Sequence, residues 1–459
     1  MRLRSPVLAA LTTGAMLFTT ACGGSAGSSE PASPSAPGPS ALRTGLVTVT
    51  FWHGIGGAPG EALQAEIDKF NAANTGRIAV KVAFQGSYTS ALAKYTSAIR
   101  DKSTPSIMVS NDITTGFIHD AGQTVPAQAM AAANPADLDL NKLRPAARNY
   151  YTAKGELLAV PLATSMPLLY VNDAILAQAG VDRSTLRTLD GVAAAARAIN
   201  AAVPGVKGIV QPFDGWWFEQ LTAAAGVAYC TPANGREPGG ATAAALTSDA
   251  QRKAFGTMAK LYTDGVGLDV GTDGANGVKA FTTGKVAMMF NSSGSIGNLQ
   301  KAGMQGYSTL PYPISGDRAT SGALIGGAAM WVSRVGHSDA EQVASWKVIS
   351  YLASAPVQER FSQASGYAPV NTDVDTSATE QAFLAREPNY ATLSKQFAET
   401  PATPATAGCL SGAMPGIRTE VVAQMQKAFA GTITIDAALA AAETAATAKI
   451  QDYRRQAGL

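Results

Sequence analysis

The chain has little charge, little histidine and little cysteine for its 459 residues. Charged residues make up 15% and the formal net charge is +2, so the basic excess of a nucleic-acid-binding protein is absent. The three histidines and three cysteines show no metal-ligand spacing, and we expect neither a metal nor a cofactor. Past the N-terminal residues, no stretch reaches the roughly 18 uncharged apolar residues of a membrane span. The hydrophobic fraction of 46% is that of a packed globular protein, of one large or two ordinary domains.

The N-terminus has the pattern of an export signal. Arg2 and Arg4 precede an apolar run from Val7 to Phe18 that is too short to span a membrane. The following Cys22, directly after small residues, resembles a bacterial lipobox, although Thr19 stands where that motif usually has Leu. We therefore expect residues 1–22 to be a lipoprotein signal peptide ending at a lipidated Cys22, with simple secretion as the alternative.

Residues 23–44 consist almost entirely of Gly, Ser, Ala and Pro. Such a segment has too little apolar surface to offset the entropy of ordering, so it predicts a disordered tether. Behind a lipidated cysteine, the tether would hold a globular body at the outer face of the cell membrane. The protein would then be extracytoplasmic and anchored, without spanning the membrane.

Two cysteines remain after Cys22, namely Cys230 and Cys409. In an exported protein, a disulfide between them is the expected state. Two separate buried thiols are the alternative, because a sequence does not show the distance between two side chains.

The globular body begins with segments of alternating strand and helix pattern. Residues 46–51 and 78–84 alternate apolar and polar positions as strands do, whereas residues 60–74 carry apolar side chains at helical spacing. Residues 88–100 are again helical, and residues 105–110 form a further strand pattern. This order predicts an α/β fold with a mostly parallel sheet and covering helices.

Ligands of such sheets bind beyond the carboxyl ends of the strands. Trp52, Tyr88 and Asp112 fall at such ends or begin the next helix, which makes them candidate ligand contacts. Core packing is the alternative for Trp52, and helix capping is the alternative for Asp112.

The stretch from Leu158 to Asn172 is apolar but contains two prolines and the polar pair Thr164-Ser165. Because proline donates no ladder hydrogen bond, the stretch does not read as one uninterrupted central strand. We expect two extended runs, 157–160 and 168–171, on either side of a kink. We interpret the kink as a crossing between two lobes that faces a ligand cleft; an ordinary buried strand ending in a turn is the alternative.

Nine motifs follow one another along the chain. They are Phe51-Trp-His53, Phe70-Asn-Ala-Ala-Asn74, Gly86-Ser-Tyr88, Pro105-Ser-Ile-Met-Val109, Thr164-Ser-Met-Pro-Leu-Leu-Tyr-Val-Asn172, Gly284-Lys-Val-Ala-Met-Met-Phe-Asn-Ser-Ser-Gly294, Ile325-Gly-Gly-Ala-Ala-Met-Trp331, Ser365-Gly-Tyr-Ala-Pro-Val370 and Met414-Pro-Gly-Ile-Arg418. Together they resemble the family 1 solute-binding proteins of ABC importers, most closely the branch that binds glycerol-3-phosphate and glycerophosphodiesters. Their common order over nearly the whole mature chain is more specific than any single motif.

The resemblance implies a two-lobe, periplasmic-binding-protein-like α/β fold that closes on its ligand by a hinge motion. Residues 45–162 and 306–336 would form the first lobe, and residues 163–305 and 337–459 the second. Three crossings would join the lobes, at Leu158 to Asn172, at Tyr307 to Pro313 and near His337.

The resemblance also implies a ligand site. Its residues would be Tyr88, Asp112, Ser165, Asp214, Trp217, Ser293, Gly327, Tyr367 and Arg418. Asp112 would accept hydrogen bonds from glycerol hydroxyls, while Arg418, with Tyr367, would bind a phosphate through its planar fork. Trp217 and Asp214 would meet the group beyond the phosphate. The alternatives are that the paired tryptophans belong to the core, that the glycine pair only makes a turn, and that Asp214 points to solvent.

The expected function is ligand capture for the permease subunits of an ABC importer, by a monomer without catalytic activity. Glycerophosphocholine or glycerol-3-phosphate would be the ligand, and a neutral oligosaccharide is the runner-up. A secreted hydrolase is a third possibility, but it needs paired carboxylates, a metal or a nucleophile. Asp112 and Asp214 are the only carboxylates that we place in the cleft, and a Gly-x-Ser-x-Gly elbow is absent from the sequence.

Overall fold

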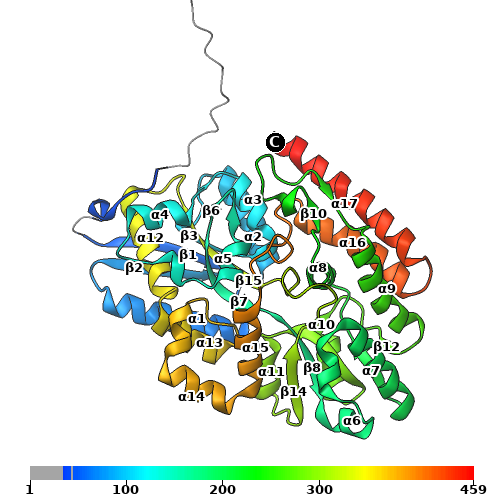
Figure 1. The fold of residues 1–459 in the computed structure, drawn as a ribbon. Coiled ribbons are helices and arrows are strands. Elements are labelled where there is room, and N and C mark those ends of the chain that lie inside the picture. Colours follow the sequence, from blue (N-terminus) through cyan, green and yellow to red (C-terminus); the bar gives the residue numbers. More distant parts are fainter. Residues whose placement is uncertain (1–34, 43–44) are drawn as a thin grey trace, which may run out of the picture. The chain divides into compact units, whose positions relative to one another are not determined.

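Two large β-sheets organise the part of the chain that the computed structural model describes, residues 35–42 and 45–459 (Figure 1). All of these residues belong to one compact unit, Pro34–Leu459. The predicted signal peptide and Cys22 lie outside the described residues. Helices cover both sheets, which confirms the mixed α/β class expected from the alternating sequence pattern.

The first sheet has the strand order β2 (Ile78–Phe84), β1 (Val47–His53), β3 (Ile107–Asn111), β15 (Gly326–Ser333) and β4 (Thr124–Val125). A further strand, β7 (Val160–Ser165), also pairs with β15. The first three strands run parallel, and β15 runs antiparallel to β3. The parallel part is therefore the strand and helix alternation that the N-terminal sequence predicted.

Helices α1 (Gly57–Ala73), α12 (Asp339–Leu352) and α13 (Ala355–Ser365) pack on this first sheet or on one another. Leu63, Ile67 and Phe70 form the buried stripe of α1, as their spacing predicted. The buried Glu66 on the same helix accepts two hydrogen bonds from Arg360 of α13, at 2.9 and 2.6 Å. This ion pair joins α13 to the first sheet's layer of helices.

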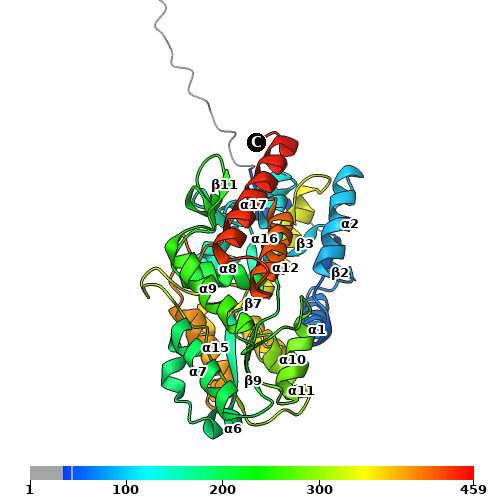
Figure 2. The ribbon, with the colours of Figure 1, turned by 90° about the vertical axis from the view of Figure 1, so that its right-hand side faces the viewer.

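The second sheet has the order β12 (Gly267–Leu268), β9 (Lys207–Val210), β13 (Val286–Ser292), β8 (Pro167–Asn172) and β14 (Tyr307–Pro311). It is mixed, because β8 runs antiparallel to both β13 and β14. Helices α7 (Leu189–Ala202), α10 (Gly274–Thr282) and α15 (Pro388–Glu399) pack on its strands. Beside it, α16 (Met414–Phe429) and α17 (Ile435–Ala457) lie side by side against α9 (Asp249–Thr263) (Figure 2).

Shorter elements connect these layers. They are η1 (Pro39–Ala41), α2 (Tyr88–Arg100), η2 (Asp112–Thr114), α3 (Thr115–Asp120), α4 (Ala127–Ala133), η3 (Leu140–Lys142), α5 (Pro145–Tyr150), β5 (Thr152–Ala153), β6 (Glu156–Leu157), α6 (Asp173–Gln178), η4 (Arg183–Arg187), α8 (Gly215–Ala224), β10 (Cys230–Thr231), η5 (Ala233–Gly235), β11 (Ala243–Ala244), α11 (Ser295–Lys301), η6 (Thr372–Thr376) and α14 (Ala378–Arg386).

The apolar stretch that the sequence singled out does cross between the sheets. Strand β7 pairs with β15 in the first sheet and β8 pairs with β13 and β14 in the second, with only Met166 between them. The Ser293 hydroxyl accepts a hydrogen bond from the Met166 N–H at 3.3 Å, and the Ser293 N–H donates to the Met166 carbonyl at 2.8 Å. The break is therefore at Met166, fixed by the turn that follows β13, whereas the polar pair Thr164-Ser165, expected as the kink, lies inside β7 and pairs with Gly327 and Gly326.

The second crossing lies further along the chain than the sequence suggested. Residues 307–311 are a strand of the second sheet, where every residue of β14 pairs with β8, so they do not belong to the first lobe as expected. The chain reaches the first sheet only at β15, and the crossing occupies residues 312–325. An alternating apolar pattern indicates a strand but does not indicate to which sheet the strand belongs.

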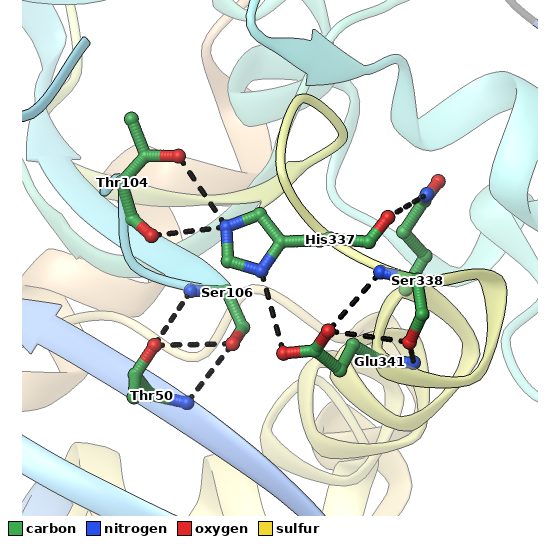
Figure 3. Close-up of polar contacts among 7 residues, drawn as sticks. Thr50, Thr104, Ser106, His337, Ser338 and Glu341 are labelled. Atoms are coloured by element: carbon green, nitrogen blue, oxygen red, sulfur yellow. Dashed lines mark hydrogen bonds and ion pairs between the residues drawn. The ribbon is translucent and has the colours of Figure 1, made fainter. Parts of the chain in front are cut away.

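The expected crossing near His337 is wrong, because the connection from β15 to α12 stays on the first sheet. His337 Nε2 lies 2.9 Å from the Thr104 carbonyl oxygen, just before β3, and Ser338 and Glu341 form the capping box of α12 (Figure 3). Since α12 and α13 pack on the first sheet's side, residues 339–365 belong there and not to the second lobe. The return to the second sheet follows later, before α15 packs on β14.

Two further predictions from the sequence concern residues outside the sheets, namely the end of the tether and the cysteine pair. Residues 35–42, the end of the expected tether, include the 3-10 helix η1, and Leu42 packs against the core. Asn134 Nδ2 also donates to the Pro37 carbonyl at 3.0 Å, so this part of the tether makes defined contacts. Cys230 and Cys409 are joined by a disulfide with their Cα atoms 5.6 Å apart, which confirms the predicted pairing.

Among the described residues, no helix combines the length and the apolar character that a membrane crossing requires.

Candidate functional site

A cavity of about 270 Å³ opens at strand ends of both sheets. Its lining consists of Asp112, Ser165, Pro212, Asp214, Trp216, Trp217, Thr272, Gly274, Asn291, Ser292, Gly326, Gly327 and Arg418. Asp112 directly follows β3, Asn291 and Ser292 end β13, and Ser165 ends β7. The cavity therefore occupies the place where α/β sheets usually bind ligands, at the carboxyl ends of strands.

Six of the nine predicted ligand residues line this cavity: Asp112, Ser165, Asp214, Trp217, Gly327 and Arg418. They come from segments far apart in the sequence, which only the crossing of the chain between the sheets brings together. Tyr88, Ser293 and Tyr367 are not part of the lining.

Arg418 is the centre of a buried ion-pair cluster. Its Nε donates to Glu219 Oε1 at 2.5 Å, and its Nη2 donates to Glu219 Oε2 at 3.0 Å and to Asp112 Oδ2 at 3.3 Å. The exposed side-chain fractions are 15% for Arg418, 2% for Glu219 and 7% for Asp112. Glu219 thus holds one edge of the guanidinium bidentately, and Nη1 donates to no other described residue.

The local sequence explains why these groups can meet. Gly215 begins α8, and a Cβ there would lie 2.4 Å from Arg418 Cγ, so only glycine lets the arginine stem lie across the helix start. Glu219 follows four residues later and therefore lies on the same face of the helix as Gly215. Arg418 itself is the fifth residue of α16, at the start of its second turn, and Pro415 is the second residue of that helix.

The electrostatics of the cluster are dominated by burial and by negative charge. The pKa of Asp112 is raised to about 6, mainly by burial; nearby Glu219 and Asp214 contribute in the same direction, and Arg418 opposes them. Burial alone would lower the pKa of Arg418, but Glu219 and Asp112 outweigh it and hold that pKa well above its usual range. Three carboxylates thus surround one guanidinium, and the site is net negative when all are ionised.

Asp214 caps a helix and also belongs to the cavity wall. Its Oδ1 accepts a hydrogen bond from the Trp216 N–H at 2.8 Å, so it is the N-cap of α8. Its carboxylate also lines the cavity and is exposed to solvent. The alternative that Asp214 points to solvent agrees with this exposure, but the residue is also part of the cavity lining.

The two tryptophans differ in how much surface they offer. Trp217 is only 4% exposed, and its ring lies 6.3 Å from that of Phe290 in a stacked arrangement. Trp216 is half-buried, and its Nε1 donates to the Ile325 carbonyl at 3.4 Å. Sequence analysis favoured Trp217, whereas Trp216 presents the larger accessible surface to the cavity.

Gly327 lines the cavity because two strands approach closely there. Its φ is +111°, and a Cβ would lie 1.8 Å from the Ala163 carbonyl oxygen of β7. A side chain at this position is excluded by both backbone conformation and space. The neighbouring Gly326 leaves room for Trp216, whose Cζ2 would lie 3.0 Å from a Cβ there.

The three predicted residues outside the lining fall into two groups. Tyr88 and Tyr367 lie near Asp112. Burial, and then Tyr367 and Asp112, raise the pKa of the Tyr88 hydroxyl, and burial, followed by Asp112, raises that of Tyr367. Ser293 is fully buried, and its hydroxyl and N–H are both taken up by Met166 in the crossing. Its neighbour Ser292 reaches the cavity instead.

Sequence reasoning missed Glu219, Asn291 and Ser292, and it ranked Trp216 too low. The one signal for Glu219 was a carboxylate four residues after Gly215, in a helix with no other charged residue. Among the described residues, no group of three or more His, Cys, Asp or Glu side chains could hold a metal ion. The arrangement offers carboxylate acceptors, two guanidinium N–H groups on Nη1 and an indole face, which together suit a small hydroxyl-bearing solute.

Comparison with known proteins identifies the family. A family model described as bacterial extracellular solute-binding protein matches residues 65–392. The sn-glycerol-3-phosphate-binding periplasmic protein UgpB of Salmonella typhimurium is 27% identical over 401 residues, which are 86% of this chain and 90% of that protein.

Solved structures share the fold. UgpB from Mycobacterium tuberculosis in complex with glycerophosphocholine superimposes with a TM-score of 0.74 at 19% identity, over 88% of this chain and 99% of that one. The cyclic alpha-maltosyl-1,6-maltose binding protein from Arthrobacter globiformis gives 0.73 at 22% identity, over 89% and 100% of the two chains. At these identities the likeness establishes the fold, which is that of periplasmic solute-binding proteins, as the sequence predicted.

Proposed function

Because the chain belongs to the family of bacterial extracellular solute-binding proteins, we propose that it captures a glycerophosphodiester, with glycerophosphocholine as the first candidate. Members of this family bind small molecules outside the cytoplasm and deliver them to ABC permeases, and they are not enzymes. The proposal therefore concerns which solute the cavity selects.

The observation that carries the proposal is the charge of the cavity. Asp112 and Asp214 in the lining, with Glu219 behind Arg418, outnumber Arg418, the one cation among the lining residues. A ligand with two negative charges would enter a negative field, whereas glycerophosphocholine carries one phosphate charge and one quaternary ammonium and is neutral as a whole. Its glycerol end also supplies hydroxyl donors, which a carboxylate accepts.

We infer an orientation from the same residues. Asp112 would accept from the glycerol hydroxyls, and Arg418 Nη1 would donate to a phosphate oxygen close by. The trimethylammonium group would then lie toward the indole of Trp216 or Trp217, because an aromatic face attracts a cation. Asp214, exposed on the cavity wall, would add an opposite charge.

A panel measurement tests the proposal. Mass spectrometry of solute retained by the natively purified protein should show a glycerophosphodiester, and calorimetry should rank glycerophosphocholine above glycerol-3-phosphate and above maltotriose. Equal or tighter binding of glycerol-3-phosphate would contradict the charge argument. Binding of none of the three would contradict the glycerophosphodiester assignment altogether.

A neutral oligosaccharide is the second candidate. It is favoured by the same absence of an uncompensated cation in the cavity, and by the shared fold with a maltosyl-maltose binding protein. Carboxylates and indole faces suit sugar hydroxyls and sugar rings as well as they suit glycerol and choline. Maltotriose binding without glycerophosphocholine binding in the same panel would select this candidate.

We further propose that Cys22 carries the lipid that anchors the protein, and that a monomer closes over its ligand by hinge motion. Metabolic labelling with a radioactive fatty acid should mark the wild type and leave a Cys22→Ser variant unlabelled; label in both would refute the anchor. Small-angle X-ray scattering should give a smaller radius of gyration for the protein with ligand than without it. The scattering mass should be that of one chain.

A further inference from the structure

We propose that Glu219 is a specificity-determining residue, which positions Arg418 and so makes the cavity reject phosphate monoesters. This inference rests on the proposed function, because it names the feature that separates a phosphodiester or neutral solute from a dianionic one. Glu219 does not line the cavity, and its hydrogen bonds position Arg418, which does.

The geometry of the ion pair limits what Arg418 can offer a ligand. An arginine binds a phosphate best with two parallel N–H groups from one edge of its fork. Here the edge formed by Nε and Nη2 is taken by Glu219, at 2.5 and 3.0 Å, and Nη2 also donates to Asp112 at 3.3 Å. Only Nη1 is left, so the cavity receives the N–H groups of a single nitrogen.

The fold also prevents the pair from opening at low cost. Glu219 is 2% exposed and would be left as a buried, uncompensated charge if Arg418 turned toward a ligand. The stem of Arg418 is confined by Gly215, where its Cγ lies within 2.4 Å of a hypothetical Cβ position. A phosphate monoester would have to compete with a buried carboxylate for a guanidinium that cannot move away from it.

The charge of Glu219 acts in the same direction. Only the Arg418 guanidinium separates the Glu219 carboxylate from the cavity, and burial keeps the effective dielectric constant between them low. Replacing it by an isosteric amide removes one negative charge and releases at least one edge N–H of Arg418. The binding affinity of a dianionic ligand should increase more through this change than that of a zwitterionic or neutral ligand.

The test compares Glu219→Gln with a matched control in the full-length mature protein. Glu380→Gln is the control, because Glu380 is also 2% exposed and hydrogen-bonded, to Gln363 at 2.8 Å, but lies on α14 away from the cavity. Calorimetry would measure glycerol-3-phosphate, inorganic phosphate, glycerophosphocholine and maltotriose on each protein.

We expect Glu219→Gln to bind glycerol-3-phosphate at least about tenfold more tightly than wild type, while Glu380→Gln equals wild type. An unchanged ratio between glycerol-3-phosphate and the other solutes, with all affinities lowered equally, would show a merely structural role and overturn the inference. If wild type binds no solute of the panel, the proposed function fails, and a gain of phosphate binding in Glu219→Gln still supports the role of Glu219.

A second variant covers the case in which Glu219→Gln does not fold. Glu219→Asp keeps the charge but shortens the reach by one methylene, so Arg418 should be misplaced without the cavity becoming less negative. We expect weaker binding of the preferred solute and no gain for glycerol-3-phosphate. A gain of phosphate binding in Glu219→Asp, or wild-type affinities throughout, would contradict the proposal.

Discussion

Replacing Asp112 by Asn should make the protein more stable at neutral pH and worse at binding. Asp112 is buried beside Arg418, yet its pKa is raised from 3.8 to about 6. The attraction of Arg418 is already included in that balance, so the ionised carboxylate is on balance unfavourable in the folded protein. Asn has nearly the same shape and carries no charge.

The sign and the size follow from linkage. An acid whose pKa is higher in the folded than in the unfolded state favours folding below the unfolded pKa, and that contribution is lost as the pH rises through the folded pKa. For a shift from 3.8 to about 6, ionisation of Asp112 costs about 3 kcal/mol at pH 8 and about 1 kcal/mol near pH 4.5. Asp112→Asn should therefore stabilise by up to about 3 kcal/mol at pH 8, and by much less at pH 4.5.

Urea unfolding of both proteins at the two pH values measures this difference. Asp214→Asn is the control, because that exposed carboxylate lines the same cavity and Asn caps a helix equally well. The control should change the free energy of unfolding little at either pH. Destabilisation by Asp112→Asn that is equal at both pH values would show that the carboxylate stabilises the fold, and the reasoning from burial would be refuted.

The same variant should lose affinity for the solute at pH 8. An amide accepts through one oxygen only, and it no longer balances Arg418 across the cavity. A stabilised protein with weaker binding would mark Asp112 as a residue kept for function at a cost in stability.

Three further outcomes are expected. Arg418→Lys should weaken solute binding about tenfold or more, because lysine lacks the planar fork. Arg418→Ala should also lower the free energy of unfolding by about 3–5 kcal/mol, because two buried carboxylates lose their partner. A calorimetric affinity of Arg418→Lys equal to that of wild type would contradict this. Replacing both Cys230 and Cys409 by Ser should lower the free energy of unfolding by on the order of 5 kcal/mol, given a sequence separation of 179, and two reactive thiols in unreduced wild type would contradict the bridge. Gly327→Ala should cost at least about 2 kcal/mol, because its Cβ would lie 1.8 Å from the Ala163 carbonyl oxygen, and a wild-type denaturant midpoint would exclude that clash.

Some of these features could be predicted because the signal lies within one segment. Pro167 after Thr164-Ser165 indicated a break in the apolar stretch, and the strands on either side indeed join different sheets. The spacing of Leu63, Ile67 and Phe70 indicated the buried face of α1. Local rules of strand and helix geometry were sufficient for both.

Features that depend on distant partners could not be predicted in this way. Glu219 and Arg418 are 199 residues apart, and nothing in the local pattern of either helix indicates that they meet. The sheet on which α12 packs was wrongly predicted for the same reason, since the apolar face of this helix could cover either sheet. Trp216 and Trp217 are neighbours on a mostly buried helix, and only the packing of Phe290 against Trp217 shows which ring is less accessible.

Close backbone contacts lie next to the charged residues of the cavity. A Cβ on Gly116, four residues after Asp112, would lie 2.4 Å from the Ser411 carbonyl carbon, and one on Gly412 would lie 2.0 Å from the ring of Tyr453. The segment that follows Asp112 and the segment that leads to Arg418 thus touch backbone to backbone, with no flexible side chain between them. Because such contacts cannot compress, they limit how closely the segments that carry Asp112 and Arg418 can approach each other. A solute must therefore match the pairing that the fold already contains, and this favours ligands that leave the Arg418 ion pairs intact.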